Sequence, residues 1–296
     1  MTSDPRRPFG RLITAMVTPF DVAGSLDLDK AQQLANYLVE EQGNDALVIN
    51  GTTGESPTTT DAEKAELVRA VKDAVEGRAL VIAGAGNNDT IHSVQLVDQA
   101  AKAGADGLLI VTPYYNKPPQ AGVLAHFTTI ADSTDLPIIV YDIPGRAGIP
   151  IETSALIKLG EHPRIVAVKD AKALPVESAR VMAETDLAYY AGDDAMTLPL
   201  LAVGAVGVVG TSTHFSGRGT KALIEAYERG DHIEALRLYR QLLPIYTGVF
   251  RTQGTILVKA GLRERGLDVG PVRLPLVEAD DHELSHLRQD LAAAGL

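Results

Sequence analysis

The chain carries a lysine at the end of an apolar run, and this position suggests chemistry more directly than any other. Lys169 follows the apolar residues 165–168 and precedes Asp170 and Ala171, which are typical of a turn. This context predicts an amine at the mouth of a buried strand. Burial disfavours the ammonium form, so it lowers the lysine pKa and frees an amine that can form a Schiff base with a carbonyl. The alternative is a lysine that only marks where a strand meets water.

Hydroxyl groups follow two other apolar runs. Thr52 and Thr53 lie between glycines after the run at 45–50. Their hydroxyls and the neighbouring backbone amides can hold a carboxylate or a phosphate, although a plain turn explains the same residues. Tyr115 lies in a loop after the run at 106–111, where side-chain packing is the alternative to a role in proton transfer.

A tyrosine and an arginine complete the set of reactive residues. Tyr141 ends the run at 137–141, and Arg146 follows shortly after it. A phenol can relay protons, and a guanidinium can bind a carboxylate through two hydrogen bonds. With Lys169 for a carbonyl and the threonines for a carboxylate, these residues suit a keto acid as substrate. The lysine imine would supply the electron sink of an aldol-type addition, so we expect neither a metal nor a cofactor.

The positions of these residues depend on the fold, which the apolar runs predict. Continuous apolar runs alternate with amphipathic segments, and this alternation is typical of parallel β/α units. Eight such runs predict an α/β fold, a closed (β/α)₈ TIM barrel, with an open doubly wound sheet as the alternative. In a barrel the residues that follow the strands meet at one face. The runs cover 12–17, 45–50, 79–84, 106–111, 137–141, 165–169, 187–191 and 206–210.

The helical segments show their own signals. Thr60 and Glu63 have the spacing of a capping box before a periodic apolar segment, and Gly77 is placed to end that helix. From about residue 216 onward the periodicity is helical only. We therefore predict a catalytic barrel over residues 1–215 and a C-terminal helical domain over residues 216–296.

Composition limits the class of protein. The 296 residues are 45% hydrophobic, which is enough for a large core. Acidic residues number 38 against 27 basic ones, giving a net charge of −11, so nucleic acid and anionic membranes are not expected partners. The absence of cysteine excludes disulfides and thiolate zinc sites. The sequence has no long apolar run and no signal-peptide pattern at its start, which favours a cytoplasmic protein.

One pattern suggests different chemistry. Residues 282–286 read H-E-x-x-H, the zinc-protease pattern. On a helix, however, Leu284, Leu287 and Leu291 share one face, while His282 and His286 lie on nearly the opposite side. The histidines are therefore expected to face solvent rather than a buried zinc site.

Five motifs in order carry a resemblance to a known family. They read GTTGES, VTPYYNKPP, YDIPGRAG, VKDA and GDD. With them, the chain resembles the pyruvate-dependent Schiff-base aldolases of the N-acetylneuraminate lyase superfamily, and more narrowly the dihydrodipicolinate synthase family. The resemblance runs from about Gly10 to the C-terminus. It implies a barrel with a C-terminal helical domain, and the condensation of pyruvate with aspartate 4-semialdehyde to 4-hydroxy-tetrahydrodipicolinate in lysine and diaminopimelate biosynthesis.

The resemblance also implies roles for individual residues. Lys169 would form the imine with pyruvate, and Tyr141 would donate and accept protons. Thr52 would link Tyr141 to Tyr115, which would reach into the active site of a neighbouring subunit. The family is commonly a tetramer built as a dimer of dimers, so a homo-oligomer is expected.

Further implied roles concern the substrates. Thr53 would bind the pyruvate carboxylate with help from the backbone of Val209, and Arg146 would face the carboxylate of the aldehyde substrate. Glu55 would be structural. Arg146 favours the semialdehyde over two related substrates of the superfamily, a keto-deoxy sugar acid and N-acetylneuraminate. A barrel that binds a small acid for regulation without turning it over is a further alternative.

Two departures from the family pattern have consequences. The segment 207–211 reads GVVGT where the family usually has a sequence like G-x-I-S-V, which leaves the shape of this loop open. The positions of the family's feedback site for lysine correspond here to Asp61, Lys64 and His92. Because the Lys64 cation would oppose the ammonium of bound lysine, we expect lysine to inhibit weakly or not at all.

Overall fold

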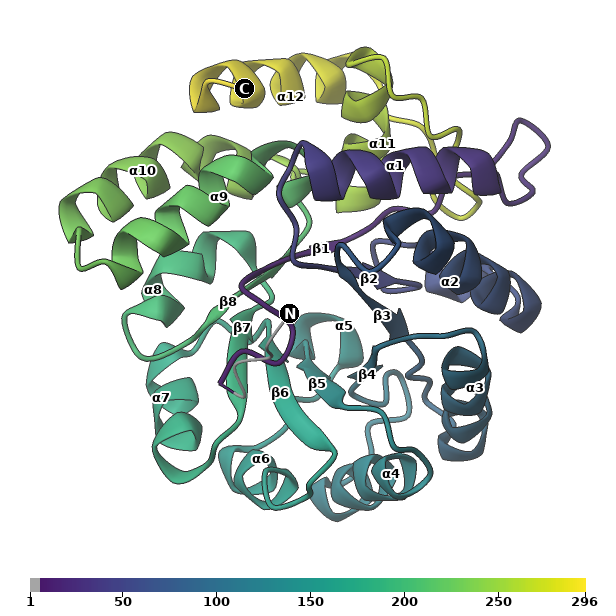
Figure 1. Cartoon of the computed structure of the whole chain (residues 1–296), viewed down its shortest axis with the longest axis vertical. Coiled ribbons are helices and arrows are strands. Elements are labelled where there is room, and N and C mark those ends of the chain that lie inside the picture. The colour runs from purple at the N-terminus through teal and green to yellow at the C-terminus, as the bar shows by residue number, and fades with distance from the viewer. Residues whose placement is uncertain (1–5) are drawn as a thin grey trace.

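The computed structural model describes residues 6–296 and shows a closed barrel of parallel strands surrounded by helices (Figure 1). Each strand pairs with the next, and β8 pairs in parallel with β1, which closes the barrel. The predicted barrel is confirmed, and the open sheet was the wrong alternative. The strands are β1 (Leu12–Ala15), β2 (Ala46–Ile49), β3 (Leu80–Gly84), β4 (Gly107–Val111), β5 (Ile138–Asp142), β6 (Ile165–Asp170), β7 (Ala188–Ala191) and β8 (Gly207–Gly210).

The strands read as continuous apolar runs because both of their faces are buried. Ile13, Val48 and Ile82 belong to the cluster that includes Tyr141 and Tyr190 and fills the barrel interior. The alternate residues of the same strands belong to the larger cluster formed with the surrounding helices. A β-strand projects successive side chains to opposite faces, so one run supplies both cores.

The surrounding helices follow the strands along the chain. Thr60 and Glu63 form the predicted capping box at the start of α2, and Gly77 follows its end with φ +76°. The helices are α1 (Leu28–Glu40), α2 (Asp61–Val75), α3 (Thr90–Lys102), α4 (Gln120–Asp132), α6 (Thr153–Leu159), α7 (Pro175–Glu184), α8 (Thr197–Leu201) and α9 (Thr213–Glu228). Short helices η1 (Ser56–Thr58), α5 (Pro144–Ala147) and η2 (Asp194–Met196) lie in the loops after β2, β5 and β7.

Three further helices form the C-terminal segment. They are α10 (His232–Gly248), α11 (Gly254–Glu264) and α12 (Asp281–Ala294), and α10 packs against both α9 and α12 (Figure 1). The expected helical extension is therefore present. The boundary expected between residues 215 and 216 falls inside α9, and the division into two domains stays a prediction. No helix within residues 6–296 combines the length and apolarity needed to cross a membrane.

The H-E-x-x-H pattern lies on α12. His282 is exposed, and the Glu283 carboxylate accepts the backbone N–H of Asp280 at 3.0 Å in a capping box. The glutamate of the pattern thus stabilises the start of the helix. In the described part of the chain, no group of three or more His, Asp or Glu side chains is arranged to hold a metal ion.

Closure of the barrel depends on a close backbone approach at Gly207. A Cβ at this position would lie 2.0 Å from the carbonyl oxygen of Arg11, which accepts the N–H of Val208 at 2.9 Å. We predict that Gly207→Ala lowers the free energy of unfolding by roughly 1–3 kcal/mol, because the β8–β1 pair must separate. Urea denaturation measures this change. Gly145→Ala is the control, since its Cβ would meet no atom within 4 Å, and an equal loss in both variants would contradict the prediction.

Candidate active site

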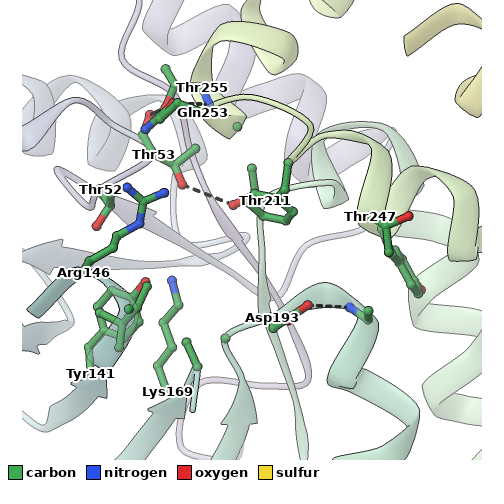
Figure 2. Close-up of a pocket in the computed structure, with 18 residues that line it drawn as sticks. Thr52, Thr53, Tyr141, Arg146, Lys169, Asp193, Thr211, Thr247, Gln253 and Thr255 are labelled. Atoms are coloured by element: carbon green, nitrogen blue, oxygen red, sulfur yellow. Dashed lines mark hydrogen bonds between the residues drawn. The ribbon is translucent and has the colours of Figure 1, made fainter. Parts of the chain in front are cut away.

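A cavity of about 610 Å³ opens at the carboxyl ends of the strands (Figure 2). Its walls combine strand-end residues of the barrel with residues of α10 and the start of α11. Five of the residues singled out in the sequence line it, namely Thr52, Thr53, Tyr141, Arg146 and Lys169. The fold therefore brings together side chains that are far apart along the chain.

Lys169 lies on β6, directly beside Tyr141 of β5. The two residues are partners in the parallel register, and the lysine Nζ is 4.2 Å from the centre of the tyrosine ring. Lys169 is only 5% exposed. The strand extends one residue further than the apolar run indicated, because Asp170 still pairs with Asp142 of β5.

The surroundings of Lys169 favour the neutral amine. Its pKa falls to about 8, chiefly because burial removes water from the ammonium. The carboxylate of Asp194 acts in the opposite direction, and the guanidinium of Arg146 lowers the pKa further. At pH 7 roughly a tenth of such a lysine is unprotonated, compared with about one part in three thousand for an ordinary lysine.

Tyr141 is held in its protonated form. Burial raises its pKa to about 12, although the charge of Arg146 and a hydrogen bond with Thr52 lower it. The phenol therefore enters any reaction as a proton donor. Figure 2 shows its hydroxyl directed toward the cavity between the Lys169 amine and the Arg146 side chain.

The hydroxyls of Thr53 and Thr211 face each other in the wall of the cavity. Thr53 Oγ1 lies 3.2 Å from Thr211 Oγ1, and the two share a hydrogen bond (Figure 2). Val209 lies on β8, two residues before Thr211, and is buried. The hydroxyls can rotate to donate to an anion in the cavity.

Arg146 and Tyr115 lie near each other, because the N–H of Tyr115 donates to the carbonyl of Ala147 at 3.3 Å, but only Arg146 lines the cavity. Arg146 belongs to the short helix α5, is exposed, and lines the mouth of the cavity. Tyr115 follows β4 with φ +75° and is 89% exposed, outside the residues that line this cavity. A single chain does not bring Tyr115 to Lys169.

Comparison with known proteins identifies the family of this chain. The model of the dihydrodipicolinate synthetase family matches residues 8–294. The chain belongs to this family. It is 63% identical to the 4-hydroxy-tetrahydrodipicolinate synthase of Acidothermus cellulolyticus over 97% of this chain and 93% of that protein. It is 55% identical to 4-hydroxy-tetrahydrodipicolinate synthase 2 of Streptomyces coelicolor, over 100% of this chain and 98% of the relative.

A solved structure of the family is similar throughout. The crystal structure of DHDPS from Cyanidioschyzon merolae with lysine bound superposes with a TM-score of 0.95 at 46% identity, covering 97% of this chain and 99% of that one. The barrel and the C-terminal helices are therefore shared features of the dihydrodipicolinate synthetase family.

Asp194 is a residue whose place in the site the sequence did not indicate. It is buried, and its carboxylate accepts the backbone N–H groups of Thr211 at 3.1 Å and Ser212 at 2.9 Å. It thereby ties the end of β7 to the loop after β8 and raises the pKa of nearby Lys169, while burial raises the pKa of Asp194 itself. The motif GDD was visible, but the contact spans 17 residues and requires the barrel.

His214 supports the same loop from behind. Its Nε2 accepts the N–H of Val17 at 3.2 Å, and its Nδ1 donates to the Thr211 carbonyl at 2.8 Å. Burial lowers its pKa to about 4, so the ring is neutral at physiological pH and keeps one donor and one acceptor. The cavity residues of the C-terminal segment were also missed, because Thr247, Phe250 and Gln253 show no motif.

A second cavity of about 440 Å³ shares Thr52 and Arg146 with the first. The three positions of the expected feedback site, Asp61, Lys64 and His92, all line it. His92 Nε2 lies 2.8 Å from a carboxylate oxygen of Asp61, and Lys64 Nζ donates to the Thr59 carbonyl at 2.5 Å. The three positions therefore lie together on one cavity.

The lowered pKa of Lys169 leads to a testable titration. We expect an amine-reactive label to modify Lys169 with a pH midpoint of about 8, measured by peptide mass mapping across pH. Asp194→Asn removes the carboxyl group that favours the ammonium form, so the midpoint moves to lower pH. A midpoint near that of an ordinary lysine, or an upward shift in the variant, would contradict this description of the site.

Proposed function

We propose that this chain condenses pyruvate with L-aspartate 4-semialdehyde to 4-hydroxy-tetrahydrodipicolinate through an imine on Lys169. The observation that carries the proposal is the buried Lys169 amine in register with the protonated Tyr141. Membership of the dihydrodipicolinate synthetase family supports it. A regulatory barrel without turnover would have no use for a desolvated lysine beside a phenol.

The first half of the reaction forms the imine. The Lys169 amine attacks the keto carbon of pyruvate, a C–N bond forms, and the former carbonyl oxygen leaves as water. Tyr141 supplies a proton to that oxygen, which is the role of a general acid. Thr53 holds the pyruvate carboxylate together with the backbone at Val209, which fixes the keto carbon next to Nζ.

The second half forms the new carbon–carbon bond. The imine loses a proton from the methyl carbon, and the resulting enamine attacks the aldehyde carbon, whose oxygen takes up a proton. The amine of the semialdehyde then displaces Lys169 and closes the ring. Over both halves one water is released, and Lys169 is regenerated. Thr52 connects Tyr141 to Tyr115 of a neighbouring subunit, which exchanges protons with solvent.

Arg146 binds the carboxylate of the semialdehyde at the mouth of the cavity. We predict that Arg146→Gln raises the KM for aspartate semialdehyde about 10- to 100-fold and changes the KM for pyruvate much less, because a charge-assisted bidentate contact is lost. Steady-state kinetics with each substrate varied measure the two effects. Arg146→Lys is the control that keeps the charge but not the bidentate geometry.

The same assays decide between substrates. A keto-deoxy sugar acid and N-acetylneuraminate are the alternatives within the superfamily. Turnover of either at a rate comparable to that with pyruvate and aspartate semialdehyde would contradict the proposed substrate pair.

The exposed Tyr115 supports an oligomer in which subunits complete each other's sites, as a dimer or a dimer of dimers. A mixture of inactive Tyr115→Phe and Lys169→Arg chains tests this. Random reassociation in equal amounts would restore about a quarter of the wild-type activity, since half of the dimers are mixed and each has one intact site. No regain would show that Tyr115 acts within its own chain.

Regulation by lysine is expected to be weak. The cation of Lys64 lines the second cavity and would oppose the ammonium of bound lysine. We predict little inhibition at sub-millimolar lysine in initial-rate assays, and stronger inhibition of Lys64→Gln. Half-maximal inhibition of the unmodified protein at sub-millimolar lysine would disprove this.

The cytoplasmic location expected from the sequence stays a prediction.

A further inference from the structure

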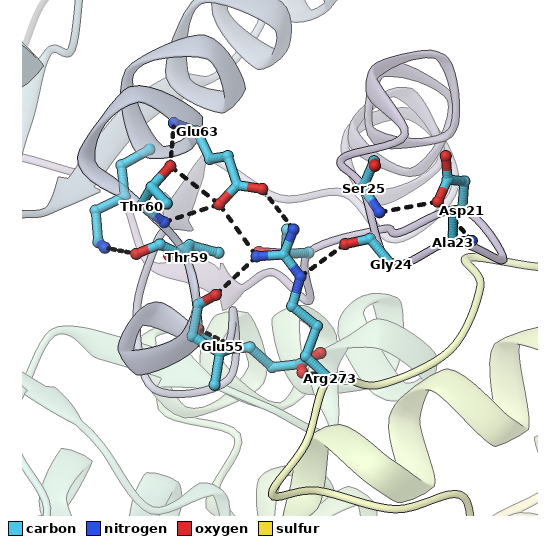
Figure 3. Close-up of polar contacts among 12 residues, drawn as sticks. Asp21, Ala23, Gly24, Ser25, Glu55, Thr59, Thr60, Glu63 and Arg273 are labelled. Atoms are coloured by element: carbon cyan, nitrogen blue, oxygen red, sulfur yellow. Dashed lines mark hydrogen bonds and ion pairs between the residues drawn. The ribbon is translucent and has the colours of Figure 1, made fainter.

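The C-terminal segment contacts the loop that carries Thr52 and Thr53, and Figure 3 shows Arg273 of this segment beside Glu55 of the loop. We call residues 51–59 the threonine loop. Its Glu55 has φ +56°, and its carboxylate is buried. One carboxylate oxygen lies 2.7 Å from Nζ of Lys259 on α11, with both side chains 1% exposed. The other accepts the backbone N–H of Arg273 at 2.8 Å.

The lysine of this pair is fixed by further contacts. Lys259 Nζ also donates to the carbonyl of Pro271 at 2.7 Å and lies 4.4 Å from the centre of the Phe20 ring. A buried ion pair is tolerated only when its remaining hydrogen bonds are satisfied, and breaking it leaves an uncompensated charge. The pair therefore fixes Glu55 relative to α11.

Two other residues of the C-terminal segment bind the same loop. Thr255 of α11 is fully buried, and its hydroxyl donates to the carbonyl of Thr53 at 2.9 Å. The Arg273 guanidinium donates to the carbonyl of Thr58 at 2.7 Å and also pairs with Glu63 of α2. The loop is thus held at its beginning, middle and end.

Hydrogen bonds within the loop connect Glu55 to the segment of Thr52 and Thr53, the two threonines proposed to act in the reaction. The N–H of Glu55 donates to the carbonyl of Thr52 at 3.2 Å, and the N–H of Gly54 donates to that of Gly51 at 3.1 Å. A left-handed backbone at a non-glycine residue persists only when its surroundings determine it. Release of Glu55 would therefore displace Thr52 and Thr53.

We propose that Thr255, Lys259 and Arg273 are positioning residues for the reaction. They hold the threonine loop in the conformation in which Thr53 binds the pyruvate carboxylate and Thr52 contacts Tyr141. These three residues would then contribute to catalysis by holding the loop, and of the three only Thr255 also lines the cavity. The proposal rests on the function proposed above for Thr52 and Thr53.

Thr255→Val is the sharpest test, because it removes one hydroxyl and keeps the shape of the side chain. We expect the KM for pyruvate to rise about 5- to 10-fold, the effect of one buried hydrogen bond. The backbone amides of Gly54 and Glu55 should exchange with solvent at least about fivefold faster. Thr255→Ser keeps the donor and should restore both values.

Two further variants separate positioning from stability. Leu156→Ala weakens the packing of α6, where Leu156 is buried, and α6 packs against α4 and α7 on the opposite side of the barrel from α11 (Figure 1). It should lower the melting temperature with no change in the KM for pyruvate. The double variant Glu55→Gln with Lys259→Met removes the ion pair without leaving a buried charge, and it should raise the KM for pyruvate as Thr255→Val does.

These measurements distinguish failure of the positioning proposal from failure of the proposed function. Unchanged exchange at Gly54 and Glu55 in Thr255→Val would overturn the hold on the loop, whatever the protein catalyses. Faster exchange with an unchanged KM for pyruvate, or an equal KM change in Leu156→Ala, would overturn the positioning role. A wild-type protein that does not turn over pyruvate would refute the proposed function, while the exchange data would still decide whether the loop is held.

Discussion

The site depends on the removal of the Lys169 amine from water. An ammonium inside a barrel loses its hydration, and only partial compensation comes from Asp194, so its pKa falls to about 8. The same burial raises the pKa of Tyr141 to about 12. Desolvation disfavours the charged form of both groups. Lysine is charged when protonated and tyrosine when deprotonated, so the same burial favours a neutral amine and a neutral phenol side by side.

The barrel supplies that environment by its register. Tyr141 and Lys169 lie opposite each other on adjacent parallel strands, and the following residues, Asp142 and Asp170, pair one step further out. A shift of one residue in either strand would turn the reactive side chain of that strand from the cavity to the helix layer. The reactive pair is therefore fixed by backbone pairing, and the loops around it supply the groups that bind carboxylates.

Much of this arrangement was predictable from the sequence. Eight apolar runs indicated the strands, the Thr60–Glu63 capping box indicated a helix start, and strand ends indicated where polar residues would meet. The family prediction is confirmed by relatives that match nearly the whole chain. The roles of Lys169 and its neighbours stay predictions, although five of the seven proposed residues line one cavity.

What the sequence could not indicate depends on contacts between distant segments. Asp194 and His214 each hold the Thr211 backbone through buried polar contacts, and such contacts leave no periodic signal. Glu55 was expected to be structural, but its partner Lys259 lies in a helix more than 200 residues away that has no motif of its own. The structure of a single chain does not test the expected role of Tyr115, because that role requires a neighbouring subunit.

The central claim is that Lys169 is the imine-forming nucleophile, and reductive trapping tests it most directly. The protein is incubated with pyruvate and borohydride, digested, and mapped by mass spectrometry. The account predicts a reduced pyruvate adduct on Lys169 that depends on pyruvate and disappears in Lys169→Arg. An adduct on another lysine, or no adduct in a protein that still turns over both substrates, would contradict it.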